Sequence, residues 1–282
     1  MQLRIIINLL LFVFVIGLTV FLLKTEKPED KIEPVLVSSI DKEEINRISI
    51  HRKDKPTISF KKTEIHWQIT EPYPAPAHPN RIKSILDLLS TPSSNQLNIE
   101  LLDLEQLGLE TPSVSLKLND YSFEFGLTNP LDQSRYLRFD NMAHTIPDQL
   151  YYQLTSNETF FIDPKLIRNP DHVISIQTPD YTLNKINDSW KLNPELELPN
   201  ATPNTIFNGW QQLEANQVEK LEEATSNGLI EITFTDNTNL IFDIVSSDDN
   251  LILANKALEL QYNISSFMAD IIFPKPQPPV TD

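Results

Sequence analysis

The stretch WQITEPYPAPAHPNRIKSILDLL, from Trp67 to Leu89, decides the fold because the chain repeats its pattern later. The second copy, WKLNPELELPNATPNTIFNGWQQL, runs from Trp190 to Leu213. Each copy opens with an alternating apolar segment, continues through a proline-rich connector and ends in an apolar stripe with helical spacing. The recurrence of the whole order indicates an internal duplication.

The prolines that begin the two predicted helices give the alignment between the copies. Proline has a fixed φ and no N–H, so it suits the first position of a helix. Setting Pro79 against Pro203 aligns three apolar pairs, which are Ile82 with Ile206, Leu86 with Trp210, and Leu89 with Leu213. A single offset that matches three core positions supports the duplication.

Period-two alternation predicts strands on both sides of each helix. The segment from Ile65 to Ile69 alternates around Trp67, and two strands with a tight turn between them follow each helix. The predicted turns lie at 119–120 and 236–237, and the predicted closing helices lie near 147–154 and 264–272. We therefore predict an α+β fold built from two tandem units of antiparallel sheet plus helices, each of roughly 110 residues.

The segment from Ile5 to Leu23 is uncharged, and 16 of its 19 residues are Leu, Ile, Val or Phe. As a helix it would span roughly 28 Å, close to the thickness of the bilayer hydrocarbon. A cleaved signal peptide would need spaced small residues after the run, whereas Leu22, Leu23 and Lys24 stand there. A buried core helix would need a polar face. The sequence thus predicts an uncleaved, single-pass membrane anchor.

Composition divides the chain into five predicted segments. They are a cytoplasmic tip and anchor (1–23), a stalk (24–40), a first α+β repeat (41–165), a second α+β repeat (166–273) and a disordered proline-rich tail (274–282). The basic residues that flank the anchor do not by themselves favour either orientation.

Charge and glycine content argue against two large classes of function. The formal net charge of −16, with 39 acidic and 23 basic residues and no basic patch, disfavours nucleic-acid binding. The chain has only five glycines, each isolated, so neither a Walker loop nor a dinucleotide-binding loop can form. There is no cysteine for a thiolate metal site or nucleophile.

No motif predicts catalytic chemistry. The histidines are His51, His66, His78, His144 and His172, and none pairs with another at metal-ligand spacing. We expect them on the surface, with His66 facing outward and His78 as a helix cap or surface residue. The acidic residues, including Asp248 and Asp249, are expected to be solvated, and the tryptophans to pack in the core. We predict no catalytic, cofactor-binding or metal-binding residue.

Three stretches carry a family resemblance. WQITEPYPAPAHPNRIKSILDLL, LGLETPSVSLKL (107–118) and FGLTNPLDQSRYLRFD (125–140) resemble the domain-of-unknown-function family DUF4340. The resemblance implies a single-pass protein of the bacterial inner membrane, with its N-terminus inside and most of the chain periplasmic. Members are often encoded beside ABC-type transport components of the gliding-motility auxiliary type. The resemblance supplies no catalytic residue.

These observations favour a non-enzymatic function without a cofactor. We expect an anchored periplasmic accessory or scaffold protein whose partners are membrane or envelope proteins, with ABC-transporter subunits as candidates. Two alternatives stay open. One is a periplasmic hydrolase that acts on envelope polymers through acidic residues, and the other is a module that binds a glycan or a peptide.

Overall fold

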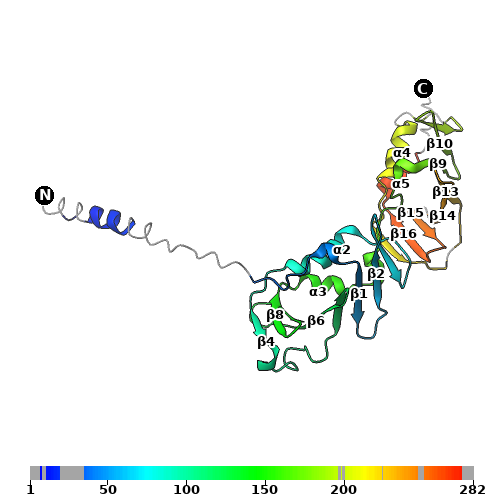
Figure 1. Cartoon of the computed structure of the whole chain (residues 1–282). Coiled ribbons are helices and arrows are strands. Elements are labelled where there is room, and N and C mark those ends of the chain that lie inside the picture. The colour runs from blue at the N-terminus through cyan, green and yellow to red at the C-terminus, as the bar shows by residue number, and fades with distance from the viewer. Residues whose placement is uncertain are drawn as a thin grey trace. The chain divides into compact units, whose positions relative to one another are not determined.

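The computed structural model describes residues 7, 11–19, 35–195, 198, 201–223, 225–246 and 251–274 (Figure 1). The chain divides into two compact units, Met1–Val35 and Leu36–Asp282. In the first unit, Ile7 and residues 11–19 are helical, and their large apolar side chains are exposed. None of the helices in the described ranges is long and apolar enough to cross a membrane. Much of the predicted anchor, residues 24–34 of the stalk and residues 275–282 of the tail lie outside the described residues.

The second unit contains a first antiparallel sheet of eight strands in the order β3-β2-β1-β5-β6-β7-β8-β4. The strands are β1 (Arg47–Arg52), β2 (Ile58–Lys62), β3 (Trp67–Glu71), β4 (Gln96–Asn98), β5 (Val114–Leu118), β6 (Tyr121–Thr128), β7 (Arg135–Phe139) and β8 (Met142–Ile146). The helices of this half are η1 (Lys42–Glu44), α2 (Pro79–Leu86), η2 (Asp87–Ser90), η3 (Ile99–Leu101), α3 (Gln149–Leu154) and η4 (Glu158–Phe161).

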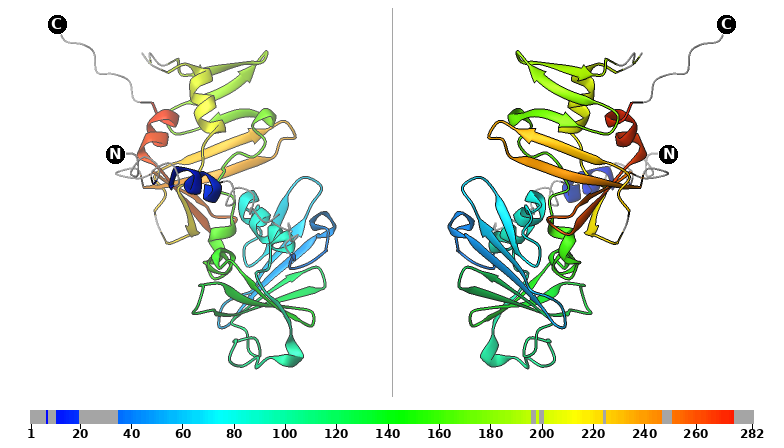
Figure 2. Two further views of the ribbon diagram at one scale, coloured as in Figure 1. Left: turned by 90° about the vertical axis from the view of Figure 1, so that its left-hand side faces the viewer. Right: turned by 90° about the vertical axis from the view of Figure 1, so that its right-hand side faces the viewer.

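A second antiparallel sheet of eight strands has the order β11-β10-β9-β13-β14-β15-β16-β12. The strands are β9 (Val173–Gln177), β10 (Thr182–Ile186), β11 (Ser189–Asn193), β12 (Gln217–Lys220), β13 (Leu229–Phe234), β14 (Asn239–Ser246), β15 (Leu251–Asn255) and β16 (Leu260–Ile264). The helices are η5 (Pro170–His172), α4 (Pro203–Gln211) and α5 (Ser266–Ile272). The two sheets, blue to green and green to orange in Figure 2, share one strand order, which fits the predicted internal repeat.

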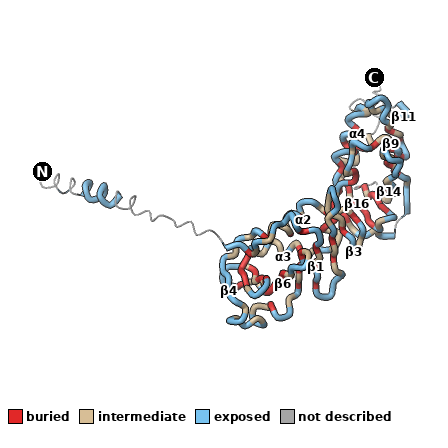
Figure 3. The backbone as a smooth tube through the Cα atoms, viewed as in Figure 1, coloured by how far each residue is buried: buried red, intermediate tan, exposed pale blue. Residues whose placement is uncertain are grey.

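The core lies where alternate strand residues and one face of each helix meet (Figure 3). In β1, Ile48 and Ile50 are buried while Arg47 and His51 are exposed, as period-two alternation requires. The helix α2 buries Ile82 and Ile85, and α4 buries Ile206 and Trp210. The α+β class predicted from the sequence is therefore confirmed.

Two asparagines form the predicted tight turns. Asn119 and Asn237 adopt positive φ values of 52° and 62°, a backbone region that asparagine tolerates better than most residues. The Asn119 side chain also accepts hydrogen bonds from the backbone N–H groups of Asn46 and Arg47 at 3.0 and 3.1 Å. It thereby ties the β5–β6 turn to the start of β1.

The structure corrects several local predictions. Ile65 lies in the turn before β3 and is 86% exposed, because β3 begins only at Trp67. Trp67 and Trp190, predicted to pack in the core, are only half-buried and lie on the edge strands β3 and β11. The strands β4 and β12 were not predicted, since three- and four-residue strands are too short to show an alternation.

Candidate functional site

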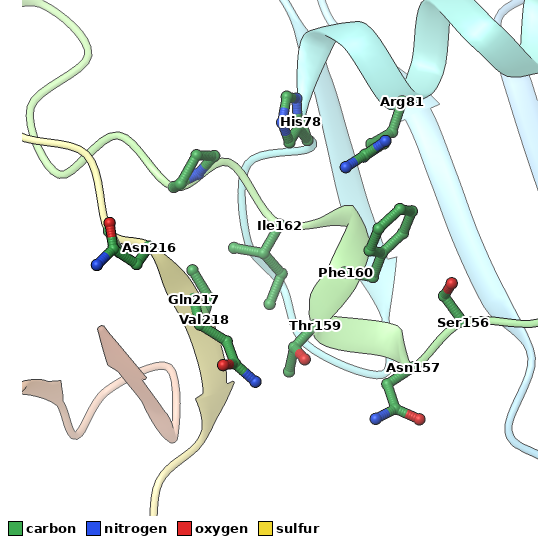
Figure 4. A pocket seen from close by; sticks show the side chains of 12 residues that line it. His78, Arg81, Ser156, Asn157, Thr159, Phe160, Ile162, Asn216, Gln217 and Val218 are labelled. Atoms are coloured by element: carbon green, nitrogen blue, oxygen red, sulfur yellow. The ribbon is translucent and has the colours of Figure 1, made fainter. Parts of the chain in front are cut away.

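A cavity of about 580 Å³ lies between elements of the two repeats (Figure 4). We call it the inter-repeat groove. Its described lining residues come from the start of α2, the η4 region, the segment after η4 and the start of β12. They are His78, Arg81, Ser156, Asn157, Thr159, Phe160, Ile162, Pro164, Ala215, Asn216, Gln217 and Val218.

The segment 161–164 lies along the groove and forms backbone hydrogen bonds to both repeats. On one side, His78 N–H donates to the carbonyl of Phe161 at 2.7 Å, and Asp163 N–H donates to the carbonyl of Pro76 at 2.9 Å. On the other side, Ala215 N–H donates to the carbonyl of Pro164 at 2.9 Å. These backbone hydrogen bonds fix the wall formed by α2 and η4 relative to the start of β12.

Arg81 gives the groove its charge. Its guanidinium carbon lies 4.0 Å from the centroid of the Phe160 ring, a cation–π contact that orients the side chain over the groove (Figure 4). The nearby carboxylate of Asp163 is paired with Arg168, with an N···O distance of 2.6 Å. Within the described residues, Arg81 has no carboxylate in ion-pair contact, and its buried Nε has no hydrogen-bond partner. Arg81 is therefore a positive charge in the groove without a direct carboxylate partner among the described residues.

His78 stands at the N-cap of α2, as the sequence predicted, but its side chain makes no capping hydrogen bond. Its buried Nδ1 has no partner among the described residues, and the ring lines the groove. Burial, followed by the positive charge of Arg81, lowers the pKa of His78, so the imidazole is neutral at pH 7. The equivalent Thr202 does cap its helix, through Thr205 N–H at 3.2 Å. Threonine is among the residues that commonly cap a helix N-terminus, and histidine is not.

The other polar lining groups are amides and hydroxyls. Asn157 and Thr159 stand on the η4 side, and Asn216 and Gln217 face them from the second repeat (Figure 4). The Gln217 amide also donates to Glu219 at 2.9 Å. Amides both donate and accept, so this lining matches a ligand with its own amide or hydroxyl groups. The described lining includes no carboxylate.

The remaining histidines do not join the groove. His51 and His172 are exposed, as predicted, whereas His66, predicted to face outward, is half-buried in the turn before β3. His144 contradicts the surface prediction, because it lies on β8 with only 1% of its surface exposed. Within the described ranges no three His, Cys, Asp or Glu side chains are placed to hold a metal ion. Asp248 and Asp249 lie outside the described residues.

Sequence reasoning singled out His78 and missed the rest of the groove. Arg81, Phe160 and Gln217 stand far apart in the chain, and no motif connects them. The local signal is that Arg81 lies two residues after Pro79, off the apolar stripe of α2.

Together, fold and groove define a class: a duplicated α+β protein with a polar, positively charged groove between its repeats. The chain belongs to the family described as Domain of unknown function (DUF4340), whose family model matches residues 67–240. Neither a curated protein nor a solved structure matches the chain.

Proposed function

We propose that this protein is a membrane-anchored periplasmic binding protein without catalysis of its own. In this proposal the apolar segment Ile5 to Leu23 crosses the inner membrane once, with the N-terminus inside. The inter-repeat groove binds a segment of another envelope or membrane protein. ABC-transporter subunits are the candidate partners, on the ground of the family resemblance alone. The anchor would hold the groove near the bilayer and raise its effective concentration for membrane neighbours.

The observation that carries the proposal is Arg81 without a carboxylate partner in a groove of amides. A protein of net charge −16 has many acids that could neutralise a guanidinium, yet Asp163 and Glu214, whose charges act on the neighbouring His78, pair with Arg168 and Lys165. A carboxylate on a bound segment would supply the missing partner and form charge-assisted hydrogen bonds. The side chains of Asn157, Asn216 and Gln217 would then bond the backbone amides of that segment.

The hydrolase alternative has weaker support. A separate cavity of about 390 Å³ is lined by Glu222, Glu223, Asp243 and Glu259 among others. A general acid needs a raised pKa. Burial alone would raise the pKa of Asp243, but hydrogen bonds from Lys256 and Ser226 and the charge of Lys256 lower it on balance. Asp243 is therefore an ionised partner of Lys256, at an N···O distance of 2.8 Å.

Site-specific photocrosslinking tests the proposal. A photoreactive residue at Asn157, in the groove, is compared with one at Ile241, which is 49% exposed on β14. We expect the full-length protein in native membranes to crosslink one envelope protein from position 157 only. Arg81→Glu should abolish that crosslink, while Arg47→Glu, a change at an exposed ion pair with Asp120, should not.

Two results would contradict this proposal. One is equal crosslinking in wild type and the Arg81→Glu variant. The other is a solitary protein that hydrolyses an envelope substrate and loses this activity when one acidic residue is changed. The orientation is tested separately by fusing reporters after Asp282. An inactive phosphatase fusion together with a fluorescent cytoplasmic reporter would reverse the assigned orientation.

A further inference from the structure

The first repeat contains a second groove, between β3 and α2. Its volume is about 320 Å³. We call it the Trp67 groove, because Trp67 lines it together with Ala77, Ile82 and Leu86. The charged residues Lys42, Glu43, Lys83 and Asp87 stand around these apolar groups. It shares no lining residue with the inter-repeat groove.

The second repeat fills the corresponding place with its own side chain. Trp190 lies on β11, the edge strand equivalent to β3, and faces a lysine of the neighbouring strand as Trp67 does. The ring of Phe207, from α4, stacks on Trp190 with centroids 4.1 Å apart and planes 23° apart. The aligned helix-starting prolines place Lys83 at the position of Phe207.

The replacement of an aromatic ring by Lys83 leaves the Trp67 groove open. The Lys83 ammonium turns to the Asp87 carboxylate, at 2.5 Å, one helical turn further on. Among the described residues, no aromatic ring stacks on Trp67. Ile65, which lines the same groove, is 86% exposed. The first repeat therefore has Trp67 and the apolar residues beside it, but it lacks a second ring that corresponds to Phe207.

We infer that the Trp67 groove binds an aromatic side chain of a partner protein, in the place that Phe207 takes in the second repeat. The duplication itself supplies the template, because the same pair of elements accepts a stacked ring when one is present. Stacking on an indole face favours an aromatic ring over an aliphatic side chain of similar size. The ion pairs of Asp87 with Lys42 and Lys83 would form a polar rim around the buried contact.

The test uses the three tryptophans of the chain as reporters and references. Full-length protein with ¹⁵N-labelled tryptophan is titrated with N-acetyl-phenylalanine amide, and N-acetyl-leucine amide serves as the aliphatic probe. The three indole N–H signals are assigned with Trp67→Phe and Trp190→Phe. We expect a saturable shift of the Trp67 signal, at lower concentration with the phenylalanine probe. Trp190, already covered by Phe207, and buried Trp210 should not respond.

Two reciprocal variants make the test specific. Lys83→Phe should fill the Trp67 groove with the repeat's own ring, remove the response of Trp67 and leave the protein folded. Phe207→Lys should open the second repeat and make Trp190 responsive. Arg81→Ala should leave the Trp67 response unchanged, so this inference and the proposed function can fail separately. An unresponsive Trp67, an unchanged response in Lys83→Phe, or equal saturation by both probes would overturn the inference.

Discussion

The hydroxyl of Tyr181 joins Trp210 to the end of the last helix. It accepts a hydrogen bond from the Trp210 indole N–H at 2.8 Å and donates one to the backbone carbonyl of Ile272 at 2.5 Å. Tyr181 and Trp210 are 3% and 0% exposed. Burial dominates the raised pKa of Tyr181, so the phenol stays protonated and can donate. One oxygen atom thus connects α4 and α5 beside the second sheet.

Tyr181→Phe should lower the free energy of unfolding by about 1–3 kcal/mol, because it leaves a buried indole N–H without an acceptor and a buried carbonyl without this donor. Urea unfolding followed by tryptophan fluorescence measures the change. Tyr152→Phe, at a side chain that is 66% exposed, is the matched control and should have little effect. Equal effects of the two changes would show that the Tyr181 hydroxyl contributes nothing.

Arg135→Ala should be among the most destabilising changes in the first repeat. The guanidinium binds both carboxylate oxygens of Asp148, at 2.7 and 3.0 Å, and donates to the carbonyl of Gly126 at 2.7 Å. Its removal leaves a nearly buried carboxylate uncompensated, which costs about 3–5 kcal/mol. Thermal unfolding should show a large loss of stability. The exposed pair Arg47–Asp120 provides the control, since Arg47→Ala should barely change the melting temperature.

The tryptophans should differ in their contribution to stability. Trp210→Ala removes a fully buried side chain and should cost about 3–5 kcal/mol. Trp67→Ala should cost clearly less, because Trp67 is half-buried and faces an open groove. Chemical denaturation of both variants tests the order. A larger loss for Trp67 would mean that its groove is filled in the protein alone.

The buried His144 should make stability depend on pH. Burial lowers the pKa of His144, so the unfolded chain takes up a proton before the folded chain does. The contribution of His144 to the free energy of unfolding is therefore complete above about pH 6.5 and is lost as the pH falls below that value. The urea concentration at which half of the protein is unfolded should decrease as the pH is lowered from 7.5 to 5.5. His144→Gln should make this decrease smaller. An unchanged pH dependence in His144→Gln would assign the effect to other groups.

The repeated fold could be predicted from local patterns. The helical stripe that begins at Pro79 and the alternation around Ile48 reappear in the second half, and Asn119 marks a turn by its residue type. Such signals lie within a few consecutive residues, where backbone preference and side-chain spacing act directly. The burial of His144 could not be predicted, because it depends on the pairing of β8 with both β7 and β4.

The sequence alone determined the apolar N-terminal segment, the duplication and the order of the longer strands and helices, because each follows from the spacing of neighbouring residues. Only the tertiary structure decided which side chains meet. Arg81, Phe160 and Gln217 line one groove because backbone hydrogen bonds hold the segment after η4 between the repeats. The alignment already set Lys83 against Phe207, but only packing showed that one position closes a groove and the other leaves it open. Contacts between distant segments depend on the folded geometry, which no local pattern records.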